Sequence, residues 1–433
     1  MAYTSLYTAL YTALYPGGVS SGAIFPVPLR FINLGKESQP GSLAASTYTL
    51  PCTTFAPADR YAYAPDQAWR AAMGRLYGYT QGIRLAGISL GGPLYADGIG
   101  YPMASVLGDY WQAVASGTPG TASSLSASSA AGAGTIVVSS GAGFFAGALI
   151  SVGATGSTAE EVREVTGVSG GTLALSSALY QAHASGGTVI PYTAFNGVIH
   201  NFAQLNAGLG AGGPSAGQPP TYTYEDYTQV PAGSGARQYA YGCFSEVSVI
   251  AGAQRLTEWD GKMTAYASQI AGSQPATQLT GVAPQAAWRT TVSIAGAGTL
   301  SAAGCKLTLA RKTGAKFVNS NQQDPPVIIR GPLSARLSLS FDPAGDEDAL
   351  LYYLDNTQPA VQITSANGLA GMEFASVTIS AQVAAFDRAE LTDSRDLFGY
   401  DTTVRCVAQT VNAGPSGGQS PVVVSLQNQV ISY

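Results

Sequence analysis

The chain has 433 residues, of which 46% are apolar and 10% carry a charge, and its formal net charge is −5. The length allows two or three domains of the usual ~100–200 residues, and the charged fraction is well below the usual value of about 25%. This balance disfavours a protein that grips nucleic-acid phosphates through basic patches. The 53 glycines and 24 tyrosines indicate a turn-rich β protein rather than a helical one.

Cysteine and histidine are too sparse for the common metal sites. The chain has two histidines and no CxxC pair, so neither a metal nor a cofactor is expected. No stretch reaches the roughly 20 apolar residues of a membrane helix, and the first residues do not resemble a signal peptide. We expect no membrane insertion. Of the four cysteines, Cys52, Cys243, Cys305 and Cys406, we expect Cys243 and Cys406 to be reduced core thiols, because they lie in predicted strands; this is typical of a protein made in the cytoplasm.

The N-terminal range 1–65 is predicted to be an arm with loops. It opens on a repeated YTAL-like tetrad and is then punctuated by proline and glycine. Helical spacing of the tetrad predicts an amphipathic helix or an arm that becomes ordered on a neighbouring subunit, and a helix packed on its own domain is the alternative. The candidate inter-subunit residues are Tyr3, Leu6, Tyr7, Leu10, Tyr11 and Leu14.

A first β subdomain is predicted from ranges 66–118 and 192–273. It contains a short helix over Asp97–Trp111, with Pro102 in the first turn. The range 119–191 interrupts it with short strands and glycine turns of different composition, which predicts a small inserted β domain decorating the surface. Its polar residues His183, Glu160 and Glu161 are interpreted as structural.

The stretch Gln218–Ser268 has the clearest two-faced pattern. Phe244–Ile250 sets Val247 and Val249 on one face and Glu246 and Ser248 on the other. Period-two alternation predicts a sheet with one packed and one wet face.

Range 274–433 is predicted to be a second subdomain with the same order of elements. Strands over Ile328–Phe341, a short helix over Asp346–Asp355 and further strands from Met372 repeat the order of the first subdomain. If this duplication holds, three chains would form a ring with pseudo-sixfold symmetry; otherwise six chains are expected.

These features resemble the tail tube proteins of long-tailed bacteriophages. The resemblance lies in Gly78–Asp109, in the HNFAQLN run (His200–Asn206), in the Gln218–Ser268 block and in IRGPLSARLSLSFDPAGDEDALLYYL of the second half. It implies a mainly β, sandwich- or barrel-like fold in a subunit that is not an enzyme. Rings of such subunits stack into a hollow tube through which DNA is ejected.

The resemblance also implies the partners and the location. The partners are further copies of the chain, the tape measure, terminator and tail-tip proteins, and DNA that passes without specific binding. The protein is expected in the virion tail, assembled in the cytoplasm of the bacterial host. The inserted domain favours a non-contractile tail, because a sheath would leave it little room.

Residues on wet strand faces are the candidates for lining the channel. A neutral or acidic lining lets DNA slide, because it does not bind phosphates through counterion release. The candidate lumen-facing residues are Glu246, Ser248, Arg336, Ser338, Thr378 and Ser380.

Two other functional classes remain open. A carbohydrate-binding or adhesin-like protein, or another tail-tip component, would suit the tyrosine-rich strands and the insert. A glycoside hydrolase built on carboxylates needs no fixed motif, and its candidate acids are Asp226, Glu258 and Asp260. The P-loop and HExxH motifs of other enzymes do not occur, and no GxSxG elbow, the strand-to-helix turn that carries a catalytic serine, is predicted.

Overall fold

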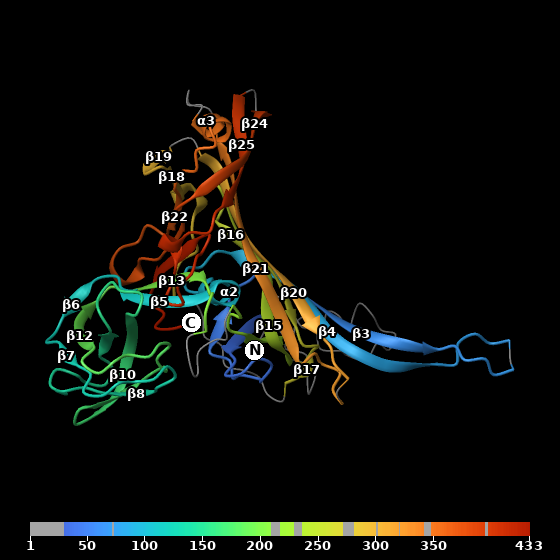
Figure 1. Cartoon of the computed structure of the whole chain (residues 1–433), viewed down its shortest axis with the longest axis horizontal. Helices are drawn as coiled ribbons and strands as arrows, with labels where there is room; N and C mark the ends of the chain where they lie inside the picture. Colours follow the sequence, from blue (N-terminus) through green and yellow to red (C-terminus); the bar gives the residue numbers. More distant parts are fainter. Residues whose placement is uncertain are drawn as a thin grey trace, which may run out of the picture.

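The computed structural model describes residues 30–71, 73–208, 217–228, 236–271, 281–299, 302–319, 321–341, 348–394 and 397–433. Within these ranges the chain is mainly β, with three antiparallel sheets, which confirms the predicted fold class at that level (Figure 1). The predicted arm residues lie outside the described ranges: Tyr3, Leu6, Tyr7, Leu10, Tyr11 and Leu14.

The large sheet runs along one side of the molecule. Its main path is β2 (Tyr48–Leu50), β1 (Phe31–Lys36), β14 (Tyr222–Tyr227), β15 (Ala236–Gly252), β20 (Ala302–Lys316), β21 (Val327–Phe341), β25 (Leu397–Cys406) and β24 (Ala384–Ser394). The 17-residue strand β15 pairs with β14 through its first half and with β20 through its second half. On its other side lie β16 (Glu258–Ala265), β17 (Gln269–Ile270), β4 (Gly78–Pro93) and β3 (Thr54–Asp66).

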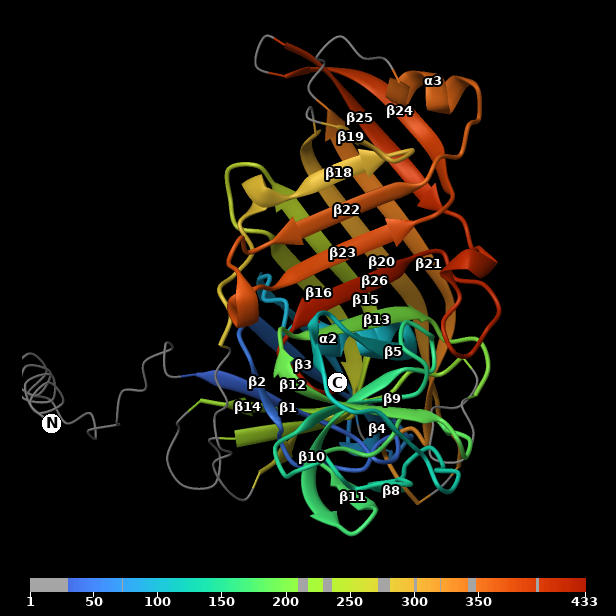
Figure 2. The same ribbon diagram turned by 90° about the vertical axis from the view of Figure 1, so that its left-hand side faces the viewer.

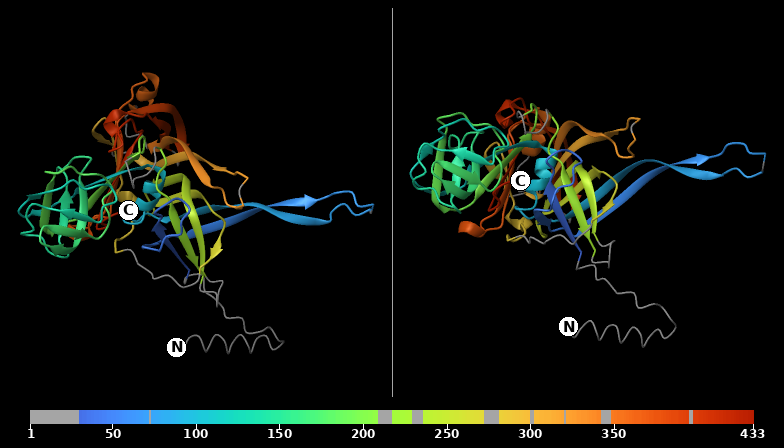
Figure 3. Two further views of the ribbon diagram at one scale, coloured as in Figure 1. Left: turned by 60° about the horizontal axis from the view of Figure 1, so that its bottom comes forward. Right: turned by 90° about the horizontal axis from the view of Figure 1, so that it is seen from below.

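The described part of range 1–65 corrects the predicted arm. Strands β1, β2 and most of β3 lie in this range and belong to the large sheet. The proline-rich stretch can still be a strand because, among the strands that the structure describes, β3 pairs with β4 alone, and an edge strand tolerates a missing N–H on its unpaired side. The β3–β4 hairpin projects far from the rest of the molecule (Figures 1 and 3).

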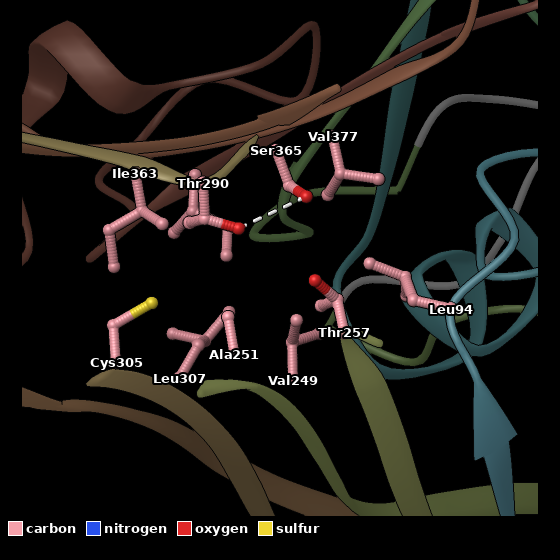
Figure 4. Close-up of a pocket in the computed structure, with 11 residues that line it drawn as sticks. Leu94, Val249, Ala251, Thr257, Thr290, Cys305, Leu307, Ile363, Ser365 and Val377 are labelled. Carbon is pink, nitrogen blue, oxygen red and sulfur yellow. Dashed lines mark hydrogen bonds between the residues drawn. The ribbon is translucent and has the colours of Figure 1, made fainter. Parts of the chain in front are cut away.

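The second sheet packs face to face on the large sheet (Figure 2). Its order is β19 (Ala297–Thr299), β18 (Thr291–Ile294), β22 (Val361–Ala366), β23 (Ser376–Ala381), β26 (Val423–Asn428), β13 (Val198–Gln204) and β5 (Gly108–Val114). In the gap between the sheets, Val249 and Leu307 of the large sheet face Ile363 and Val377 of the second sheet (Figure 4). One apolar core cluster joins residues from both halves of the chain.

The helices are short. They are α2 (Gly100–Val106) and α3 (Asp348–Leu354), with 3₁₀ segments η2 (Ala287–Arg289), η3 (Gly371–Glu373) and η4 (Thr410–Asn412). The helix predicted over Asp97–Trp111 is therefore too long at its C-terminal end, where β5 begins at Gly108 with a φ of 89°. Glycine adopts this left-handed φ without strain and so ends the helix.

The insert forms a third sheet with its own core. Its strands are β6 (Gly117–Pro119), β7 (Ser123–Ser124), β8 (Thr135–Val137), β9 (Leu149–Val152), β10 (Glu161–Ser169), β11 (Thr172–Leu175) and β12 (Thr188–Phe195). A separate apolar cluster that includes Ile136, Ile150 and Leu173 fills it. Strands β5 and β13, which flank the insert in sequence, pair directly with each other. The second sheet therefore continues beneath the insert.

The large sheet contains one four-strand order twice. The first unit is β3-β4-β16-β15 and the second is β20-β21-β25-β24, and β15 pairs with β20 where the units meet. Each unit consists of two hairpins, β3–β4 and β15–β16 in the first and β20–β21 and β24–β25 in the second. The second strands of the two hairpins pair with each other: β4 with β16, and β21 with β25. A seven-residue helix begins seven positions after β4 and after β21 (93 to 100, and 341 to 348).

Irregularities in the ladders repeat as well. The β3–β4 pairing shifts between Tyr61 and Tyr63, and the β20–β21 pairing shifts between Arg311 and Thr313. The later hairpins shift between Phe244 and Glu246, and between Phe386 and Arg388. A β-bulge fixes strand register, so these positions align the two units residue by residue: Tyr61 corresponds to Arg311, and Glu246 to Arg388.

The second sheet does not repeat in the same way. The pairs β22–β23 and β5–β13 flank β26 in mirrored order, and β26 bonds to a strand of each half. The ranges predicted as two subdomains therefore share both sheets and one core, rather than forming two separate sandwiches.

We expect Gly261→Ala to destabilise the fold. A Cβ atom at Gly261 in β16 would lie 2.4 Å from Cε1 of Phe244, which is fully buried. Overpacking of this kind costs about 1–3 kcal/mol, measurable as a loss in free energy of unfolding in urea. Gly314→Ala in β20 is the matched control, since no heavy atom lies within 4 Å of its Cβ position. Equal stability of the two variants would contradict the packing described for β16.

Candidate functional surface

The candidate functional surface is the outer face of the large sheet, which is turned away from the second sheet. Val247 and Val249 point into the core, so Glu246 and Ser248, which alternate with them along β15, point to the opposite side, where Glu246 is half-buried and Ser248 is only 3% exposed. The second sheet covers only one side of the large sheet (Figure 1). We call this open side the outer face.

Strand register places polar side chains in rows across the outer face. One row, in cross-strand register, is Gly91, Asp260, Ser248, Thr308, Arg336 and Arg405. The next row is Glu258, Ile250, Lys306, Ser338, Thr403 and Arg388. Directly opposed residues in antiparallel strands lie close enough to interact, as the hydroxyls of Ser248 and Thr308 do at 3.3 Å.

Ion pairs along the outer face balance much of its charge. Lys262 Nζ lies 3.1 Å from Glu246 Oε1, and Arg405 lies 2.8 Å from Asp387 Oδ2. A third pair joins Arg388 to Glu390. Such solvent-exposed pairs add little stability, but they leave a face that is polar without a concentrated charge of one sign.

The six predicted lumen residues fall on two different surfaces. Glu246, Ser248, Arg336 and Ser338 share the outer face of the large sheet. Val377 and Ile379 line the gap between the sheets, so Thr378 and Ser380 point away from the large sheet. Because the two surfaces lie on opposite sides of the sandwich, one face of one chain cannot present all six residues to a channel.

A buried polar cluster fixes the insert to the rest of the molecule. Arg163 of β10 donates from Nη1 to Gln112 Oε1 of β5 at 2.6 Å, and it pairs with Glu161. Glu161 also accepts the backbone N–H of Tyr180 at 2.7 Å and lies 3.1 Å from His183 Nε2. Burial alone would raise the pKa of Glu161, but the Arg163 charge and these hydrogen bonds outweigh it and hold the pKa below its usual value.

Sequence reasoning treated His183 and Glu161 as structural, and it missed two members of this cluster. Gln112 and Arg163 are 51 positions apart. No local motif links them, because the contact exists only once the insert folds back on β5.

A second buried group continues from Gln112 into the core. The Tyr110 hydroxyl lies 2.8 Å from His200 Nδ1, and the Tyr433 ring centroid lies 4.8 Å from that of His200. Burial lowers the pKa of His200 from 6.5 to about 3, so the imidazole is neutral in the folded chain. This arrangement serves packing, since the ring of His200 is fully buried among aromatic side chains.

The three candidate acids of a glycoside hydrolase do not gather in one site. Asp226 is held by Arg30 through two hydrogen bonds of 2.6 and 2.7 Å. It pairs opposite Arg237 of β15, whereas Glu258 pairs opposite Ile250 of the same strand. Thirteen positions along a strand (237 to 250) span roughly 40 Å. Glu258 and Asp260 stand on the open outer face, which offers no enclosed cleft around them.

The structure also bears on metal sites and on membrane-spanning helices. In the described ranges, no three His, Cys, Asp or Glu side chains come together as a metal site would need. None of the helices in the part of the chain that the structure describes has the length and apolar character to span a membrane.

No family model matches the chain, and no curated protein matches it. The resemblance to tail tube proteins rests on the residues of this chain alone, so the function that it implies is a proposal.

We expect stability to fall as the pH drops through the range in which His200 titrates in the unfolded chain. Its folded pKa is depressed, so only the unfolded chain takes up this proton between about pH 6.5 and about pH 3. His200→Gln removes this uptake, so its free energy of unfolding should decline less, by about 1.4 kcal/mol per pH unit. Urea unfolding at about pH 6 and about pH 5 measures the difference. Parallel slopes for the two proteins would show that His200 is not held neutral.

Proposed function

We propose that the protein is a structural subunit of a bacteriophage tail tube and has no catalytic role. The observation that carries this proposal is the duplicated four-strand unit, which builds one continuous sheet with an open, polar outer face. A sheet that repeats one unit, and whose edges at β3 and β24 are unpaired among the described strands, is suited to continue into a neighbouring copy.

The repeat favours three chains per ring over six. If each chain supplies two units, three chains supply six units around one axis, giving a pseudo-sixfold ring. Stacked rings would enclose a channel, with the outer face of the large sheet as its wall.

The composition of the outer face suits the passage of DNA. Its basic side chains are interleaved with acidic and hydroxyl side chains, and the chain as a whole carries a net charge of −5. A wall that gathered basic side chains would neutralise phosphates, release counterions and retain the DNA. A wall with mixed and balanced charge lets the polyanion slide.

The insert would then lie on the outside of the tube. It sits on the second-sheet side of the molecule, opposite the β3–β4 hairpin (Figure 3). A domain in this place fits a bare, non-contractile tail. The other partners would be those of a tail tube: the tape measure, terminator and tail-tip proteins in the virion.

Electron microscopy of the purified protein tests the proposal. We expect negatively stained preparations to contain hollow rings or stacked tubes with threefold rings. Particles that remain monomeric at every concentration and salt condition, or that bind glycans as monomers, would favour an adhesin-like role and overturn the tube.

Thiol labelling decides which face lines the channel. Ser338→Cys places a thiol on the outer face of the large sheet, and Thr378→Cys places one on the outer side of the second sheet. In assembled tubes, a maleimide on a polymer too large to enter the tube should largely fail to label Ser338→Cys and should still label Thr378→Cys. Each rate is compared with that of the same unassembled variant, and the unsubstituted chain reports labelling of its four native cysteines. The reverse pattern would move the channel to the second sheet.

A further inference from the structure

The two units meet where β15 pairs with β20, and we call this pairing the junction. It can be compared with β24, the last strand of the second unit. In the junction, Val247 and Val249 of β15 pair opposite Leu309 and Leu307 of β20. The second unit also contacts the helix of the first: Arg311 of β20 donates from Nη1 to the Val106 carbonyl at 3.1 Å. Every residue of α2 is buried, with Tyr48, Tyr222 and Tyr433 packed around Tyr101 as well.

The equivalent surface of the second unit is uncovered. Helix α3 corresponds to α2, yet Leu351, Tyr353 and Leu354 are 47%, 43% and 63% exposed. Leu391 of β24 corresponds to Val249 by alignment of the bulges, and it is 59% exposed where Val249 is 6% exposed. We call these four residues the α3 patch. Large apolar side chains gathered at one end of a sheet mark a contact surface.

The free edge next to the α3 patch has a counterpart at the far end of the sheet. Among the described residues, β24 pairs only with β25, and β3 pairs only with β4. Within the repeat, β24 is equivalent to β15 and β3 is equivalent to β20. The two edge strands are therefore the equivalents of β15 and β20, the two strands that pair with each other inside the chain.

We infer that the α3 patch and the edge of β24 in one copy dock on β3 of a second copy, in the antiparallel register of β15 with β20. This inference rests on the proposed ring-forming function, and it names the surface through which copies join. The occupant is a second copy of this chain, because the interface repeats a junction that the fold already contains.

The bulges fix the register of the proposed contact. Ser248 opposes Thr308 inside the chain, so Glu390 should oppose Ala58 of the second copy. Arg388 then opposes Arg60, and Glu390 lies diagonally from Arg60, which places a carboxylate beside both guanidinium groups.

The same alignment brings an exposed aromatic side chain to the patch. Tyr61 corresponds to Arg311, and it is 41% exposed. In the proposed contact, Tyr61 reaches the end of α3 at Leu354, as Arg311 reaches the end of α2 at Val106. Packing of the Tyr61 ring on Leu354 there takes the place of the hydrogen bond from Arg311 to the Val106 carbonyl.

Two prolines limit the number of backbone hydrogen bonds that β3 can donate in the proposed contact. Pro57 and Pro65 of β3 donate no hydrogen bond, as is common on edge strands. The proposed contact therefore depends on burial of the α3 patch as much as on backbone pairing.

Cysteine cross-linking tests the register. Chains carrying Glu390→Cys together with Ala58→Cys should form intermolecular disulfides in assembled rings, because directly opposed residues lie within disulfide reach. Glu390→Cys with Ala64→Cys is the control, since six positions along β3 move the second thiol by roughly 20 Å. Each single-cysteine variant reports any pairing with the four native cysteines. On non-reducing gels, bands of two and three chains are expected for the first pair only.

The outcomes separate this inference from the proposed function. If rings or tubes form but the Glu390–Ala58 pair does not cross-link, the register is wrong while the tube proposal stands. If no assembly forms under any condition, both are overturned.

We expect Leu354→Asp to weaken ring formation. The substitution places a charge in a patch that docking would bury, which opposes the contact without disturbing the core of the single chain. Phe145→Asp is the matched control, because Phe145 is 55% exposed but lies in the insert. Analytical ultracentrifugation should show Leu354→Asp shifted to monomer and Phe145→Asp assembled as the unsubstituted chain. Unfolding in urea checks that both variants are folded, and assembly of a folded Leu354→Asp variant would refute docking at α3.

Discussion

The rest of the structure depends on the pairing of β15 with β20. It joins the two halves of the chain in the large sheet, and it carries Val249 and Leu307 to the same side, where the second sheet covers them. Each buried aliphatic side chain of this kind contributes about 1.5–3 kcal/mol. Because β26 also bonds to a strand of each half, neither half could separate without exposing the shared core. The duplicated units therefore fold as one body.

Much of the large sheet was predictable, because its strands are covered on one side only. In Phe244–Ile250, Val247 and Val249 face the core as the period-two pattern requires, although a bulge follows Phe244 and Ser248 is buried as well. The short helices begin near their predicted positions. The arm prediction failed because β3 is an edge strand that tolerates Pro57. Alternation shows that a residue is on the wet face of its strand, but it does not show which sheet the strand joins. Thr378 and Arg336 were therefore grouped together, although they lie on opposite sides of the sandwich.

The insert is firmly docked although it has its own core. The hydrogen bond from Arg163 to Gln112 is buried. Removing either partner would leave a polar group in the interior without this hydrogen bond. A domain held in this way moves with the second sheet rather than on a tether. Sequence could not reveal this, since composition identifies the insert as a separate module but carries no sign of the contact with β5.

The helices of the two units have different surroundings. The seven residues of α2 are small, apolar or aromatic and wholly buried, and Arg311 of the second unit contacts the end of the helix. The same seven positions in α3 still carry Leu351, Tyr353 and Leu354, although nothing described in the chain covers these three side chains. An end unit that met only water would be expected to carry polar residues there, as the capping repeats of other repetitive folds do. Apolar side chains at these positions are what a unit needs if its neighbour is supplied by another chain. The proposed docking of a second copy accounts for the asymmetry between α2 and α3 within one molecule.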